Sequence, residues 1–314
     1  MQDLERAVLS AISYYDIFEY PLTSWEIFKW GYDRKQETEN RKQKIKLSEI
    51  NNILSNSEKI KNILCHKNGF YFLNGREEIV EIRRQRYLLA QKRWKKLQRI
   101  TTILQVVPFI KMIAGCNNLL INNIKPESDI DVFVVVKSGR MWMTRFLLTS
   151  LVSLLGQWRH KDRISGKICL SFFVTDDNLN LEKIAKKPYD IYLNNWVLLA
   201  APLLDRNIYS KFMQENGWAK NSMPNALEYL PVGYERKIKK ILFLDLIRNI
   251  CEKILGGKIG NELEKIFRKI QIKKMRGKGL DVIISDKMLK FHEVDRRDQF
   301  REEFEINLKT AIGS

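Results

Sequence analysis

Two aspartates one residue apart give the clearest chemical signal in the chain. Asp129 and Asp131 stand in the run ESDIDVFVVV, residues 127–136, where a strongly apolar segment follows them. In a β-strand, residues i and i+2 point to the same face, so the two carboxylates are expected side by side, with Ile130 and Val132 toward the core. Carboxylates this close repel one another unless a cation lies between them. Oxygen ligands suit Mg²⁺, so the pair predicts a magnesium site.

The residues before this strand extend the pattern. An expected apolar strand ends in Ala114, Gly115 and Cys116, twelve residues intervene, and Asp-Ile-Asp-Val follows at 129–132, with Ser128 directly before it. This arrangement resembles the DNA polymerase beta-like nucleotidyltransferase superfamily, over roughly residues 108–180. The order of the remaining segments is similar to that of uncharacterised bacterial nucleotidyltransferase-domain proteins with an N-terminal winged-helix-like segment.

The resemblance implies an activity and a role for each of these positions. The protein would transfer a nucleotidyl group from an NTP to a hydroxyl acceptor, using two Mg²⁺ ions. Asp129 and Asp131 would be the catalytic residues that hold the metals. Gly115, Cys116 and Ser128 would line the triphosphate site, where a glycine lets the backbone come close to the phosphates.

Two departures from the family pattern bear on activity. Cys116 stands where the family has Ser or Gly, and a thiol is a poorer hydrogen-bond donor to phosphate than a hydroxyl. The superfamily also commonly has a third carboxylate on a later strand, but the candidate strand 167–174 contains no acid. Asp176 and Asp177, just past its end, are the nearest substitutes as metal ligands. If neither reaches the metals, there is no strong general base. The rival interpretation is then a catalytically degenerate module of this fold that binds nucleic acid or a protein partner.

Two arginines follow the aspartate strand. Arg140 and Arg145 flank Trp142 at the start of the next expected helix. In this fold, residues entering that helix can face the nucleotide, so a contact with phosphate or base is predicted for both arginines. The alternative is an amphipathic helix end with exposed arginines. Asp190, in contrast, is interpreted as a charge at a helix N-terminus rather than as a catalytic acid.

The segments before the core indicate the first part of an α+β protein. Residues 3–15 have helical periodicity, Thr23 or Ser24 can cap a second helix, and residues 47–56 indicate a third. Asn68-Gly69 between two β-prone runs is a strong hairpin signal. Three helices and a hairpin are the order of a winged helix, which can bind nucleic acid or dock onto a protein.

The sequence therefore predicts four parts. A winged-helix-like domain (1–76) is joined by a basic helix (77–106) to a nucleotidyltransferase-like core with a mixed sheet and flanking helices (107–205), and a mostly helical basic region (206–314) follows. The joining helix is interpreted either as a solvated link or as a ridge that contacts phosphates. In the last part, the basic run 266–278 could track an RNA backbone, lie on an anionic membrane or be a solvated face.

Composition narrows the classes of protein and partner. The chain has 314 residues, of which 45% are hydrophobic and 29% charged, so it is expected to be globular rather than disordered. A net charge of +18 favours a polyanionic partner, hence RNA over a small molecule as acceptor, unless the source proteome is basic throughout. The four separated cysteines form no CxxC pair, which disfavours a zinc site and indicates a reducing, cytoplasmic location. The longest apolar stretches are too short to span a bilayer.

Overall fold

The protein is a mixed α+β protein with an open, mixed sheet. The computed structural model describes residues 3–32, 45–160, 163–226, 236–275, 281–291 and 294–313. The last three residues of the basic run 266–278 lie outside them. No helix among the described residues is both long enough and apolar enough to cross a bilayer.

The helices are α1 (Asp3–Asp16), α2 (Ser24–Trp30), α4 (Leu47–Asn56), α5 (Glu58–Ile63), α6 (Ile79–Leu104), α7 (Met141–Leu154), α8 (Ile191–Leu199), α9 (Tyr209–Glu215), α10 (Leu242–Leu255), α11 (Lys258–Met275) and α12 (Arg297–Gly313). The strands are β1 (Leu64–Lys67), β2 (Phe70–Leu73), β3 (Ile110–Gly115), β4 (Ile130–Val136), β5 (Ile168–Thr175), β6 (Ala201–Asp205), β7 (Ile283–Ile284) and β8 (Met288–Lys290). Three short 3₁₀ turns cover Asn117–Leu119, Glu182–Ile184 and Gly217–Lys220.

The central sheet has the strand order β6-β3-β4-β5-β8-β7. β4 and β5 are parallel, and all the other neighbours are antiparallel. β4 and β5 are nearly continuous apolar runs because they lie in the middle of the sheet and are buried on both faces. Since these two strands are parallel, their first residues meet at one edge of the sheet and their last residues at the opposite edge.

The N-terminal elements follow the predicted order. α1, α2 and α4 precede the β1–β2 hairpin, whose turn residues Asn68 and Gly69 have φ values of 55° and 83°. Such positive values are what a two-residue hairpin turn needs. Thr23, one of the two predicted caps, begins α2 with a reciprocal capping box to Glu26. The short helix α5 is an addition that the periodicity did not indicate.

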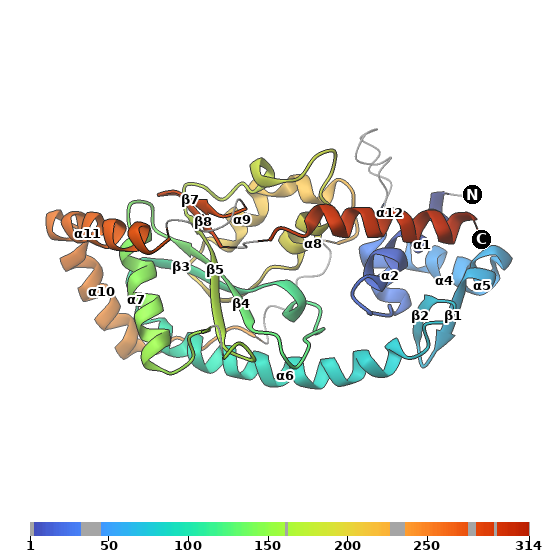
Figure 1. Ribbon diagram of the computed structural model, residues 1–314, viewed down its shortest axis with the longest axis horizontal. Helices are drawn as coiled ribbons and strands as arrows, with labels where there is room; N and C mark the ends of the chain where they lie inside the picture. Colours follow the sequence, from blue (N-terminus) through green and yellow to red (C-terminus); the bar gives the residue numbers. More distant parts are fainter. Residues whose placement is uncertain are drawn as a thin grey trace.

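The central sheet extends beyond residues 107–205. β8 pairs with β5 and β7 pairs with β8, so residues from the C-terminal part complete the sheet. Strands of two and three residues are too short for a periodic pattern to predict them. α12 then runs back along the molecule to pack against α8 and α1, which brings both chain ends to the same end (Figure 1).

The basic helix α6 lies along one long side of the molecule and ties its parts together (Figure 1). Arg83 donates two hydrogen bonds of 2.8 Å to Glu26. Arg86 forms an ion pair of 2.5 Å with Glu19, and Lys96 donates to a backbone carbonyl of the loop before β5. These contacts make α6 a structural link. The other basic side chains of α6 that are exposed are Arg84, Lys92, Lys95 and Arg99.

Candidate metal and nucleotide site

The two aspartates lie at the edge where β4 and β5 begin. Cys169, the second residue of β5, pairs with Asp131 in the parallel register. A carboxylate oxygen of Asp129, one of Asp131 and the Cys169 Sγ all lie within 4.8 Å of one another. Sequence reasoning gave no role to Cys169. The strand pairing therefore completes a group of three potential metal ligands, two carboxylates and one thiol.

Burial and mutual repulsion set the electrostatics of this group. Burial raises the pKa of Asp129, the charge of Asp131 raises it further, and Arg159 partly offsets both. Burial also raises the pKa of Asp131. Arg159 Nη1 lies 2.8 Å from Asp129 Oδ2, yet this buried oxygen accepts no hydrogen bond of good geometry from the described residues. One guanidinium thus faces two carboxylates, which leaves a place for further positive charge.

Asn117 holds Asp131 in position. Its Nδ2 donates a hydrogen bond of 2.7 Å to Asp131 Oδ2. Its Oδ1 accepts hydrogen bonds from the Tyr192 hydroxyl at 3.2 Å and from the Trp196 indole N–H at 3.0 Å. These two donors fix the orientation of the amide. Asn117 also has a φ of 56°, a backbone conformation that asparagine adopts more readily than most residues.

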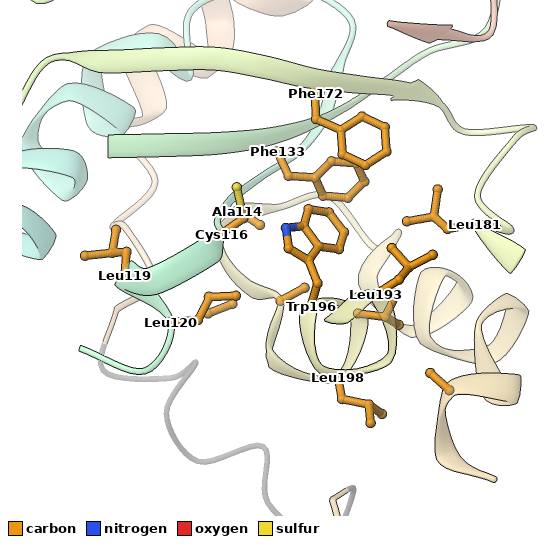
Figure 2. Packing of buried hydrophobic residues seen from close by; sticks show 14 of the residues in the cluster. Ala114, Cys116, Leu119, Leu120, Phe133, Phe172, Leu181, Leu193, Trp196 and Leu198 are labelled. Carbon is orange, nitrogen blue, oxygen red and sulfur yellow. The ribbon is translucent and has the colours of Figure 1, made fainter. Parts of the chain in front are cut away.

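An aromatic core supports this hydrogen-bond network. The Trp196 ring packs against Phe133 of β4 and Phe172 of β5, with centroid separations of 5.1 and 5.4 Å. Figure 2 shows the indole below these two rings, with its nitrogen on the side of Cys116. Cys116 is buried, and its backbone N–H donates to the Asp131 carbonyl at 3.3 Å. Packing in the core and this hydrogen bond therefore hold Cys116, the residue after β3, in place.

The two aspartates of the ligand group line a cleft. The cleft encloses about 390 Å³ between the end of α1, the loop before β4 and the start of α12. Asp129, Asp131 and two predicted site residues, Cys116 and Ser128, line it. Its cationic side chains are Lys125 and Arg296. Arg296 forms no ion pair with the described residues, so its guanidinium is available to an anionic ligand.

Gly115 has a packing role. It ends β3 and is not among the residues that line the cleft. A Cβ added to Gly115 would lie 2.7 Å from Trp94 Cη2, far closer than carbon atoms approach one another. The glycine therefore lets α6 pack closely on the sheet. The predicted role of Gly115, a close approach of its backbone to a triphosphate, is therefore not supported by its position.

Arg140 and Arg145 are at the opposite edge of the sheet from the aspartates. Arg140 Nη2 donates to the Gly256 carbonyl at 2.8 Å, and Arg145 Nη1 donates to Gln271 Oε1 at 2.5 Å. Both side chains connect α7 to α10 and α11. The reason is topological: the aspartates stand at the start of β4, whereas both arginines follow its last residue. The predicted contact of these arginines with the nucleotide is therefore not formed in this cleft.

Asp176 and Asp177 are displaced in the same way. They follow the last residue of β5, whereas Cys169 is near its beginning, about 25 Å away at ~3.3 Å per residue. Asp176 Oδ1 accepts the Ser138 N–H at 2.8 Å, and Asp177 pairs with Lys287 at 3.2 Å. Neither can share a metal ion with Asp129 and Asp131. Asp176 and Asp177 therefore do not take the place of the missing third carboxylate.

A buried ionic network fixes α12 beside the cleft. Arg297 Nη1 donates to Asp190 Oδ2 at 2.6 Å and Nη2 to Asp295 Oδ2 at 2.7 Å. Lys290 Nζ also pairs with Asp295, at 2.8 Å. Asp190 accepts the Leu193 N–H and is the N-cap of α8, which confirms its interpretation as a helix-terminal charge. The network holds the first turn of α12, and with it Arg296 and Phe300, against the cleft.

No family model matches the chain, and no match was found among curated proteins or solved structures. The function must therefore be inferred from the cleft itself. Sequence reasoning missed Asn117, Lys125, Tyr192 and Arg296, which line the cleft. It also missed Arg159 and Cys169, which lie beside the aspartates. Asn117, which directly follows the Ala-Gly-Cys segment, had a local signal; the others come from elements that only the tertiary fold brings together.

Proposed function

We propose that the protein is a divalent-cation-dependent nucleotidyltransferase that transfers a nucleotidyl group from an NTP to a hydroxyl acceptor. The observation that carries the proposal is the grouping of Asp129 and Asp131 with Cys169, in which the two aspartates line a cleft that also contains Lys125 and Arg296. The first three side chains would hold the metal, and the two cations would contact the phosphates. An arrangement of ligands beside cations suits a metal-bound triphosphate.

The two carboxylates fit one divalent cation such as Mg²⁺, whereas the Cys169 thiol beside them suits a softer ion. Asp129 Oδ2 is buried and accepts no hydrogen bond from the described residues, and Arg159 supplies a single positive charge to two carboxylates. When bound, the metal would stabilise negative charge on the transferring phosphate. The described residues contain one group of three such ligands. A second Mg²⁺, as the resemblance implies, would therefore depend on phosphate and water oxygens.

The other residues of the cleft would orient the reactants. Asn117 holds Asp131, and Arg296 would bind a phosphate opposite the metal. In the reaction, the acceptor hydroxyl oxygen bonds to the α-phosphorus while the bond from that phosphorus to the bridging oxygen breaks. Pyrophosphate leaves, and the hydroxyl proton passes to solvent water. Glu19 also lines the cleft, but its hydrogen bond with Arg86 lowers its pKa, which makes it a weak base. The proposed rate enhancement therefore comes mainly from positioning and charge, as is usual for phosphoryl transfer.

A binding module without catalysis is the second candidate. It is favoured by Cys169, because a thiol stands on the strand next to the aspartates where the family resemblance leads one to expect a carboxylate. Burial raises the pKa of this thiol, so it would not accept a proton at neutral pH. The cleft would then hold a nucleotide, and the winged-helix-like segment and basic surface would contact nucleic acid or a protein.

Transfer of label from an NTP separates the two candidates. The wild type would be incubated with each α-labelled NTP, Mg²⁺ or Mn²⁺, and either RNA or a set of small hydroxyl compounds. We expect labelled RNA, and a loss of at least a hundredfold in Asp129→Asn/Asp131→Asn. Asp177→Asn, a change at the far end of β5, is the matched control and should remain active. Nucleotide binding without transfer would favour the binding module, and absence of both would contradict the two candidates together.

A further inference from the structure

An apolar stripe runs along the outer side of α10. Apolar residues recur every four positions along it: Leu242 (85% exposed), Leu246 (56%), Ile250 (49%) and Ile254 (59%). Phe243, which is 68% exposed, lies beside them. None of the fourteen residues of α10 is buried. In a globular domain the apolar stripe of an amphipathic helix normally faces the core. Here the stripe faces away from it.

α11 continues this apolar surface. Ile259, Ile266 and Ile270 recur at helical spacing along it and are also exposed. α10 and α11 contact one another at the end of the molecule farthest from the chain termini (Figure 1). Among the described residues, nine of the seventeen large hydrophobic side chains that are exposed lie between residues 241 and 270. A concentration of this kind indicates an interaction surface rather than scattered exposure.

Charge is segregated on the same two helices. Residues 236–275 contain twelve Lys and Arg residues against four Asp and Glu residues. Three of the acids are turned inward: Asp245 pairs with arginines, while Glu252 and Glu264 accept backbone N–H groups of Phe109 and Trp142. The exposed lysines are Lys237, Lys239, Lys240, Lys253, Lys258, Lys265, Lys269, Lys273 and Lys274. The outer surface is therefore apolar and positively charged.

We propose that α10 and α11 dock onto the surface of an anionic lipid bilayer. The apolar side chains would enter the boundary between head groups and acyl chains, and the lysines would meet the lipid phosphates. Lysine suits this place because its aliphatic stem lies along apolar surface while its charge stays in the polar layer. Both helices would lie in the plane of the membrane rather than cross it. The inference is independent of the proposed nucleotidyl transfer.

Charge and side-chain type favour lipid over the other occupants. A symmetric contact between two copies would bring two lysine-rich surfaces together and be opposed by repulsion. RNA would satisfy the lysines but not the stripe, since aliphatic Leu and Ile side chains offer no ring on which bases stack. An anionic bilayer satisfies both features at once. Because Arg140 bonds to Gly256 at the end of α10 and Arg145 to Gln271 of α11, docking of these helices would also hold the core at the membrane.

Co-sedimentation of the 314-residue chain with lipid vesicles tests the proposal. Vesicles of phosphatidylcholine alone would be compared with vesicles that also contain phosphatidylglycerol. We expect at least tenfold stronger binding to the anionic vesicles, and a weakening as salt is raised. Leu246→Asp/Ile250→Asp should reduce binding at least tenfold, while Leu88→Asp, at a 65% exposed position of α6, is the matched control and should not.

Charge reversal gives an independent variant that leaves the apolar stripe intact. Lys269→Glu/Lys273→Glu should also weaken binding to anionic vesicles by about tenfold or more, and circular dichroism would verify that each variant is folded. Equal binding to both kinds of vesicle, or none to either, would overturn the proposal. So would self-association in light scattering that Leu246→Asp/Ile250→Asp abolishes, because the stripe would then be covered by a second copy. RNA binding lost in the lysine variant, without vesicle binding, would likewise overturn it.

Discussion

Cys169 of β5 lies opposite Asp131 of β4 in the parallel register, with its sulfur beside both carboxylates of the candidate metal site. Burial and the two neighbouring aspartates raise the pKa of the thiol, so without a metal it keeps its proton. A thiol is a poor ligand for Mg²⁺, which prefers oxygen, and a better one for softer ions such as Zn²⁺ or Co²⁺. Cys169 is thus the residue that determines which metal the proposed site would prefer.

Changing Cys169 to aspartate should convert the group to three carboxylates. We expect Cys169→Asp to bind Mg²⁺ about tenfold more tightly than the wild type, because a hard oxygen ligand replaces sulfur. Without metal, the variant should melt at a lower temperature, since a third carboxylate adds repulsion. Cys169→Ser, which removes the sulfur without adding charge, is the control and should gain no Mg²⁺ affinity. Mg²⁺ titrations followed by calorimetry and thermal unfolding would check both effects, and equal Mg²⁺ affinity in all three proteins would refute the expectation.

Asn117 should act by positioning Asp131. Asn117→Gly removes the amide but keeps a residue that accepts the positive φ, so backbone strain does not confuse the result. We expect metal-dependent nucleotide affinity to fall by ten- to a hundredfold, the usual range for partners that orient a metal ligand. Tyr192→Phe, which removes one of the two hydrogen bonds to the Asn117 oxygen, should have a smaller effect in the same direction. If Asn117→Gly binds nucleotide as the wild type does, Asp131 needs no such support.

The close contact between Gly115 and Trp94 predicts a coupled pair of substitutions. Gly115→Ala should destabilise the fold by about 1–3 kcal/mol, because the new Cβ would overlap the Trp94 ring. In the background of Trp94→Phe, which removes the ring atoms nearest to that Cβ, the same change should cost much less. Urea unfolding of the four proteins measures the coupling. A cost that is the same in both backgrounds would show that Gly115 is required for another reason.

Acid should weaken the network that anchors α12. Burial disfavours the charge on Asp295, but the hydrogen bonds and charges of Arg297 and Lys290 outweigh it and hold the pKa of Asp295 well below its ordinary value. The unfolded chain therefore binds this proton first, and the stabilisation is complete at neutral pH. It is lost as the pH falls below the ordinary aspartate pKa of about 4 toward the lower folded value.

The substitution Asp295→Asn measures this contribution. Because the Asp295 side chain is only 5% exposed, removing one partner of the pair should cost about 3 kcal/mol at pH 7. The difference in unfolding free energy between wild type and variant should shrink as the pH is lowered toward 3. Urea unfolding over that range checks the sign. A difference that is constant with pH would mean that Asp295 does not titrate below its ordinary range.

Local signals predicted the elements around the site well. The apolar run after Asp131 is a buried strand, Asn68-Gly69 is a hairpin turn, and Thr23 begins a helix. Each of these depends on neighbours within a few residues. The spacing of Asp129 and Asp131 likewise determines that both carboxylates leave the same face of β4.

The register of paired strands, and contacts between segments far apart in the sequence, were not predictable from such local signals. Cys169 reaches the aspartates only through the parallel pairing of β4 with β5, and Arg296 only because α12 is anchored beside α8. The same topology explains why Asp176 and Arg140 are remote from the site, although they are close to it in sequence: each follows the end of a strand whose beginning forms the site. Distance along a strand, rather than distance in sequence, decides which side chains meet.

Calorimetric titration of an NTP in the presence of a divalent cation tests the central claim most directly. Wild type, Asp129→Asn/Asp131→Asn and the control Asp177→Asn would be titrated with each NTP, with Mg²⁺ or Mn²⁺ and with metal removed by chelation. We predict metal-dependent binding by the wild type and the control, and at least a hundredfold loss in the double variant. Binding that persists without metal or in the double variant, or no binding of any NTP, would contradict the assignment of Asp129 and Asp131 to a metal and nucleotide site.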